Sequence, residues 1–105
     1  MAIEENEIHL NDVGTVFEVT LVESDVVVDI STATTLTIKF KKSDGATVMT
    51  KTASFSTDGT DGRLQYTSVA DDLDQTGPWK LQAYVIMPSW TGHSSIGEFE
   101  VFRNL

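Results

Sequence analysis

Apolar residues alternate with polar ones in several short stretches of this chain, and turn signals separate the stretches. In residues 36–41, Leu36, Ile38 and Phe40 share one face, while the intervening threonine and lysines share the other. A period of two is the spacing of a β-strand, in which successive side chains point to opposite faces. The same pattern recurs in three further segments, residues 15–22, 63–67 and 79–86. The chain is therefore expected to fold from strands.

Composition and turn signals favour the same fold class. The 105 residues include 14 Thr, 11 Val and 6 Ile, which are β-branched side chains that suit a pleated surface. Asp44-Gly45 precedes a strand-like run at residues 47–55, and a turn cluster at residues 57–62 follows it. Short strands at roughly 8 to 12 residue spacing predict an all-β fold, an antiparallel immunoglobulin-like β-sandwich of about seven strands.

The alternation also predicts which side chains form the core. The residues expected to face inward are Phe17, Leu36, Ile38, Phe40, Leu64, Tyr66, Trp79, Leu81, Ala83 and Phe99. Residues 68–73 are expected to form one helical turn at most, because Val69 and Leu73 lie four positions apart. A loop is predicted at residues 87–93, followed by a last strand.

The net charge and the absence of cysteine exclude several classes of partner. Seven basic and 16 acidic residues give a net charge of −9, which opposes binding to nucleic acid and to an anionic membrane. No apolar stretch approaches the roughly 20 residues of a membrane helix, and the acidic start lacks the basic flank of a signal peptide. The chain has no Cys, so disulfides and thiol chemistry are excluded.

No linker or repeat divides the chain. Residues 1–7 are expected to form a flexible N-terminal arm that orders on a partner, and residues 8–105 a single β-sandwich domain.

The acidic residues Asp71, Asp72 and Asp74 are the strongest candidates for acid–base chemistry, because paired carboxylates divide these roles in many hydrolases. Acidic residues at a corner between strands are more commonly solvated or hydrogen-bonded to free backbone N–H groups. The structural interpretation is favoured here.

Two further candidate sites also favour structural interpretations. Asp58 and Asp61 could contribute oxygens to a calcium ion, but the rest of an EF-hand loop is missing, which favours two Asp-Gly turns. Neither His9 nor His93 lies in a local motif with Ser or Asp, so both are expected to be surface histidines. The sequence predicts no catalytic residue, no metal ligand, no cofactor and no enzymatic activity.

The candidate partner-binding residues are Ile8, Leu10, Trp90 and His93. Ile8 and Leu10 alternate around a polar residue, so this segment could add a strand to a neighbour's exposed sheet edge. Trp90 lies in the predicted loop, where it could stack on a sugar or fill a partner's pocket. It could equally fold back over the open end of the sandwich, and both interpretations stay open.

Five segments occur in an order that resembles a known family; they are residues 12–17, 28–34, 40–45, 62–67 and 72–84. Across about residues 8–102 the chain resembles phage tail proteins of the baseplate upper protein N-terminal domain family. The resemblance implies an immunoglobulin-like β-sandwich that is a building block of a virion and has no enzymatic activity. Other virion proteins and copies of itself are the implied partners, in a virion assembled in the host cytoplasm.

The position in the particle stays open at this point. Family members often carry a C-terminal extension, whereas this chain stops at Leu105. A place in the baseplate, in an attached fibre or in the collar is therefore considered together with two alternatives. One is a capsid decoration (cement) protein, and the other is a carbohydrate or receptor recognition module that uses the Trp90 loop. An adhesion domain of a bacterial protein would differ only in context.

Overall fold

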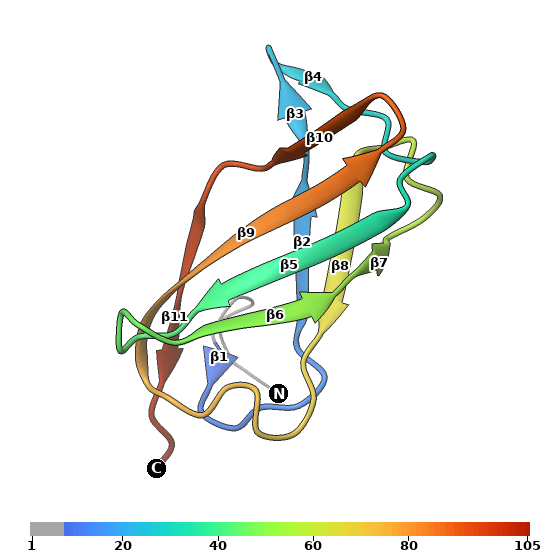
Figure 1. The fold of residues 1–105 in the computed structure, drawn as a ribbon. Helices are drawn as coiled ribbons and strands as arrows, with labels where there is room; N and C mark the ends of the chain where they lie inside the picture. Colours follow the sequence, from blue (N-terminus) through green and yellow to red (C-terminus); the bar gives the residue numbers. More distant parts are fainter. Residues whose placement is uncertain (1–7) are drawn as a thin grey trace.

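The computed structural model describes residues 8–105, and the regular elements in this part of the chain are all strands (Figure 1). Seven strands have four or more residues: β2 (Val16–Thr20), β5 (Thr35–Lys41), β6 (Val48–Thr52), β8 (Arg63–Thr67), β9 (Gly77–Met87), β10 (Trp90–His93) and β11 (Gly97–Phe102). Four have two residues: β1 (Ile8–His9), β3 (Val22–Glu23), β4 (Val26–Val27) and β7 (Ser54–Phe55). The predicted all-β fold class is confirmed.

The strands form a large sheet, a small sheet and a separate hairpin. The large sheet has the order β1-β11-β9-β5-β6, and β10 pairs with β9 on the same edge as β11. The small sheet has the order β2-β8-β7, and the hairpin consists of β3 and β4. All pairings are antiparallel except the one that joins β1 to β11, in which Ile8 lies opposite Val101. This parallel pair departs from the antiparallel arrangement expected from the sequence.

The two sheets pack against one another through aromatic side chains. The ring centroid of Phe17, on β2, lies 5.0 Å from that of Phe40 on β5 and 4.8 Å from that of Phe99 on β11. Trp79, on β9, is fully buried beside Phe99, with the ring centroids 5.7 Å apart. Aromatic pairs in tilted and edge-to-face geometry add stability beyond the area that they bury.

The core agrees largely with the alternation in the sequence. Six of the predicted residues are buried, namely Phe17, Ile38, Phe40, Leu64, Trp79 and Ala83. Four are partly buried and packed on this core, namely Leu36, Tyr66, Leu81 and Phe99. The core also contains Leu21, Val85 and Val101, which continue the same alternation, and Ile30 and Leu73, which no alternation indicates.

Residues 68–73 form one hydrogen-bonded turn and no helix, which stays within the single turn expected from the sequence. The Asp72 N–H donates a hydrogen bond to the Val69 carbonyl at 3.2 Å, which closes a single turn. Asp71 has a φ of 71°, in the left-handed region that interrupts a right-handed helix. No helix in residues 8–105 is long and apolar enough to cross a membrane.

The prediction of a loop at residues 87–93 is wrong, because most of this segment is strand. Trp90 lies opposite Met87, so only Pro88 and Ser89 form the turn between β9 and β10. The alternation is hard to recognise there because the segment is rich in small and polar residues.

A third difference concerns residues 47–55, which were expected to form one strand. They divide at Ala53, so that β6 joins the large sheet and β7 joins the small one. The Ala53 N–H donates a hydrogen bond to the Leu36 carbonyl at 2.9 Å, which ties the crossing point to the large sheet.

Candidate functional site

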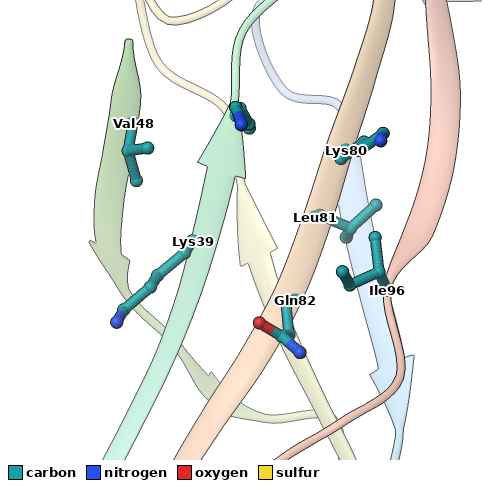
Figure 2. Close-up of a pocket in the computed structure, with 7 residues that line it drawn as sticks. Lys39, Val48, Lys80, Leu81, Gln82 and Ile96 are labelled. Atoms are coloured by element: carbon teal, nitrogen blue, oxygen red, sulfur yellow. The ribbon is translucent and has the colours of Figure 1, made fainter. Parts of the chain in front are cut away.

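A hollow of about 260 Å³ lies on the face of the large sheet that points away from the small sheet (Figure 2). We call it the lysine hollow. Its lining residues are Lys39, Lys41, Val48, Lys80, Leu81, Gln82 and Ile96.

The strand alternation explains why the lysines face outward. Ile38 and Phe40 are buried in the core, so Lys39 and Lys41 project from the opposite face of β5. The antiparallel register with β9 places Gln82 opposite Lys39 and Lys80 opposite Lys41. The outward lysines of β5 were visible in the sequence pattern, but the pairing with β9 that completes the hollow was not.

The hollow concentrates positive charge on an acidic protein. It holds three of the five lysines of a chain whose net charge is −9. The other two lysines form ion pairs, Lys42 with Asp74 at 2.7 Å and Lys51 with Asp72 at 3.1 Å. Within residues 8–105 no lysine of the hollow has an ion-pair partner. An acidic ligand would therefore meet ammonium groups that are not held in ion pairs by the described residues.

Apolar side chains flank the lysines. Figure 2 shows Ile96 close to Leu81 on one side of the hollow and Val48 on the other. Ile96 is 60% exposed, although it is a large aliphatic residue. A surface that combines free ammonium groups with exposed aliphatic side chains suits a ligand with both carboxylates and apolar side chains.

Neither His93 nor Trp90 lines the lysine hollow, but His93 lies near it through Tyr84. The His93 ring centroid lies 4.6 Å from that of Tyr84, and the Lys39 Nζ lies 5.3 Å from the Tyr84 centroid. Trp90 is half-buried against the core, and its ring covers Gly92 so closely that an added Cβ there would lie 2.4 Å from it. Of the two interpretations of Trp90, the packed one therefore agrees with the structure.

Ile8 and Leu10 belong to the chain's own fold. Ile8 pairs with Val101 in the large sheet, and the Leu10 N–H donates a hydrogen bond to the Phe102 carbonyl at 2.8 Å. Both side chains pack on the chain's own core. The idea that they insert into a neighbour does not fit this placement, because their strand and core contacts are already made. The proposed arm, residues 1–7, lies outside the described residues.

Asp72 is a fixed structural anion at the corner before β9. Its carboxylate accepts hydrogen bonds from the Tyr66 hydroxyl and, at 2.9 Å, from the Val69 N–H, and it pairs with Lys51. Burial raises the pKa of Asp72, but the hydrogen bonds from Tyr66 and Val69 outweigh it and hold the pKa below its ordinary value. Burial, together with the hydrogen bond to Asp72, raises the pKa of Tyr66 to about 12. Neither group exchanges its proton near neutral pH.

The other acidic candidates also have structural partners. The Asp58 carboxylate accepts a hydrogen bond from the Thr60 N–H at 3.0 Å, and the Asp61 carboxylate accepts one from the Arg63 N–H at 3.1 Å. The hydrogen bonds from the Thr60 hydroxyl and N–H lower the pKa of Asp58. Across residues 8–105 no three His or acidic side chains are grouped so that they could hold a metal ion.

Comparison with known families identifies the domain. The family model of the BppU N-terminal domain matches residues 5–102. The chain belongs to the BppU N-terminal domain family. BppU denotes the baseplate upper protein, so the resemblance seen in the sequence is confirmed. A search of curated proteins found no match. The BppU N-terminal domain is a structural domain of phage baseplates, which implies a virion component that associates with other virion proteins.

Proposed function

We propose that this chain is a non-enzymatic building block of a phage baseplate that docks through the outer face of its large sheet. The observation that carries the proposal is the family match over residues 5–102. The lysine hollow supplies the surface, because its three ammonium groups are available to an acidic partner.

The bonding of the acidic residues supports a structural role. Asp72, the most buried carboxylate of the corner, is held by three hydrogen-bonding groups of its own chain. Asp74 pairs with Lys42, and Asp58 is bonded within its turn. Groups held in this way stabilise the loops that contain them.

The arrangement of the sheets supports an immunoglobulin-like sandwich, because aromatic residues of β2 contact β5 and β11 across a shared interior. Such a rigid body offers its sheet faces, edges and loops as working surfaces. In a symmetric particle one such surface, repeated many times, is sufficient for assembly.

Mass spectrometry of purified virions, followed by electron microscopy with a label on this chain, tests the proposal. The expected result is a protein present in finished particles, with the label at the tail tip. Label on the head would identify a capsid decoration protein instead. Synthesis during infection without incorporation into particles would contradict the structural role altogether.

A recognition module that binds carbohydrate through Trp90 has less support. The Trp90 ring covers Gly92 and packs on the core, so its face is partly occupied by the protein itself. His93 is stacked near Tyr84 and is the more accessible of the two candidates.

A further inference from the structure

The hairpin of β3 and β4 projects from one end of the molecule and belongs to neither sheet (Figure 1). It carries three exposed valines, Val22, Val26 and Val27, the most exposed of which is Val26 at 65%. None of the three belongs to the hydrophobic core of the domain. Val22 lies directly opposite Val27 across the hairpin, and exposed apolar groups that adjoin one another can mark an interaction surface.

The tip of the same hairpin is acidic and has a defined shape. Ser24 and Asp25 form the two-residue turn, and their φ values of 51° and 66° are those of the turn type that matches strand twist. Glu23 and Asp25 place two carboxylates at the tip. In the part of the chain that the structure describes, neither carboxylate forms an ion pair.

The lysine hollow has the complementary composition. It presents three unpaired ammonium groups flanked by Val48, Leu81 and Ile96, whereas the hairpin presents two unpaired carboxylates among valines. Opposite charges placed around apolar contacts give a protein interface both register and stability.

We propose that the β3–β4 hairpin of one copy of this chain docks in the lysine hollow of a second copy. A contact within one copy does not fit, because Figure 1 shows the hairpin beyond one end of the molecule and the end of β5, where Lys41 lies, toward the other. The contact joins two different surfaces, so it is head-to-tail. Repetition of such a contact builds a ring or a row of copies.

The net charge of −9 is compatible with this contact at moderate salt. Repulsion between whole copies is screened over about 10 Å at 0.1 M salt, whereas close, partly desolvated pairs are screened much less. Local complementarity then decides whether copies associate. This contact uses the same surface as the proposed function, but the two can be tested separately. A chain that never self-associates can still be incorporated into virions.

Charge reversal on each surface tests the proposal by sedimentation of the full chain over a range of concentrations. Lys39→Glu with Lys80→Glu, or Glu23→Lys with Asp25→Lys, is expected to weaken self-association about tenfold or more. An equimolar mixture of the two double variants is expected to recover association, because one copy then offers an acidic hollow to a basic hairpin.

The matched control for these variants is Arg63→Glu, which reverses an exposed charge on the small sheet. It is expected to leave self-association unchanged, while circular dichroism checks that all variants are folded. A parent chain that remains monomeric at millimolar concentration overturns the proposal. Equal weakening by Arg63→Glu, or a mixture that fails to associate, also overturns it.

Disulfide trapping gives an independent test, because the chain contains no Cys. Ser24→Cys places one thiol at the hairpin tip, and Ile96→Cys places another at the hollow. Under mild oxidation, a mixture of the two variants is expected to yield mainly the mixed dimer. Mainly tip-to-tip dimers, or the same yield with a control Thr67→Cys variant on the small sheet, would overturn the head-to-tail arrangement.

Discussion

The Tyr66 hydroxyl donates a hydrogen bond to the Asp72 carboxylate, and Asp72 is only 4% exposed. The same carboxylate accepts a hydrogen bond from the Val69 N–H and pairs with Lys51 on the neighbouring sheet. One buried anion thus joins β8, the corner that follows it and β6. Charge-assisted hydrogen bonds of this kind are stronger than neutral ones, so the corner depends on Asp72 being ionised and Tyr66 being protonated.

The thermal stability is therefore expected to fall at both extremes of pH. Because the pKa of Asp72 is below its ordinary value of 3.8 in the folded state, its contribution is present above that value and is lost as the pH falls below it. The pKa of Tyr66 is raised from 10.0 to about 12, so its contribution is present below pH 10 and is lost as the pH rises through 12. Melting temperatures measured from pH 2 to pH 12 test both the loss of stability at low pH and the loss at high pH.

The Asp72→Asn variant tests whether Asp72 causes the loss of stability at low pH. At neutral pH the variant is expected to be less stable by about 1–3 kcal/mol, because it leaves the buried bonding site only partly satisfied. Its melting temperature is expected to depend less on pH below 4. Asp71→Asn is the control, because Asp71 is exposed and Asn also tolerates its left-handed φ. If Asp72→Asn loses stability at low pH as much as the parent does, Asp72 is not the group responsible for that loss.

Replacement of the buried tryptophan should be costly. Trp79 is fully buried, and its indole N–H donates a hydrogen bond to the Gln75 carbonyl at 3.0 Å. Trp79→Ala is expected to lower the free energy of unfolding by about 3–5 kcal/mol in urea titrations. Trp79→Phe keeps much of the volume and is expected to cost less. A Trp79→Ala protein that unfolds like the parent would show that this side chain is not central to the core.

The sequence predicts the core well where a strand alternates and poorly where the chain is irregular. Ile38 and Phe40 follow from the period of two. Ile30 and Leu73 are just as buried but lie outside regular strands, so no periodicity reveals them. β10 was missed for a related reason, since its pairing with β9 is a tertiary property that the short segment does not encode by itself.

The candidate site was visible only in part. The sequence pattern placed Lys39 and Lys41 on the outer face of a strand, but the hollow also needs Lys80 and Ile96 from elsewhere in the chain. The register of β5 with β9 brings these residues together, and the alternation within each strand does not specify that register. The binding residues expected from the sequence were Ile8, Leu10, Trp90 and His93, and of these only His93 lies near the hollow.

The β1 segment provides a prediction about stability. Ile8 and Leu10 are half-buried against the core of their own chain, so Ile8→Ala and Leu10→Ala are each expected to cost about 1–2 kcal/mol. Urea titrations of the free protein measure this loss. Val13→Ala is the control, because Val13 is exposed and its replacement is expected to change stability by less than about 0.5 kcal/mol. Normal stability combined with failed incorporation into virions would instead favour insertion into a neighbour.

Two glycines with similar backbone angles give a matched pair for the last prediction. Gly62 and Gly45 have φ values of 72° and 74°. A Cβ added at Gly62 would lie 2.8 Å from the Val28 carbonyl oxygen and 2.9 Å from that of Leu21, whereas one added at Gly45 would meet no atom within 4 Å.

Both Gly→Ala replacements incur the cost of a left-handed backbone, about 1–2 kcal/mol, but only Gly62→Ala also forces backbone atoms apart. Gly62→Ala is therefore expected to be clearly the less stable of the two in urea titrations. The Gly62 carbonyl also accepts a hydrogen bond from the Leu21 N–H, at 2.8 Å, so the strain reaches the base of the β3–β4 hairpin. Gly62→Ala is accordingly expected to weaken self-association, while Gly45→Ala leaves it unchanged. Equal stability of the two variants would show that the contact around Gly62 is looser than the structure indicates.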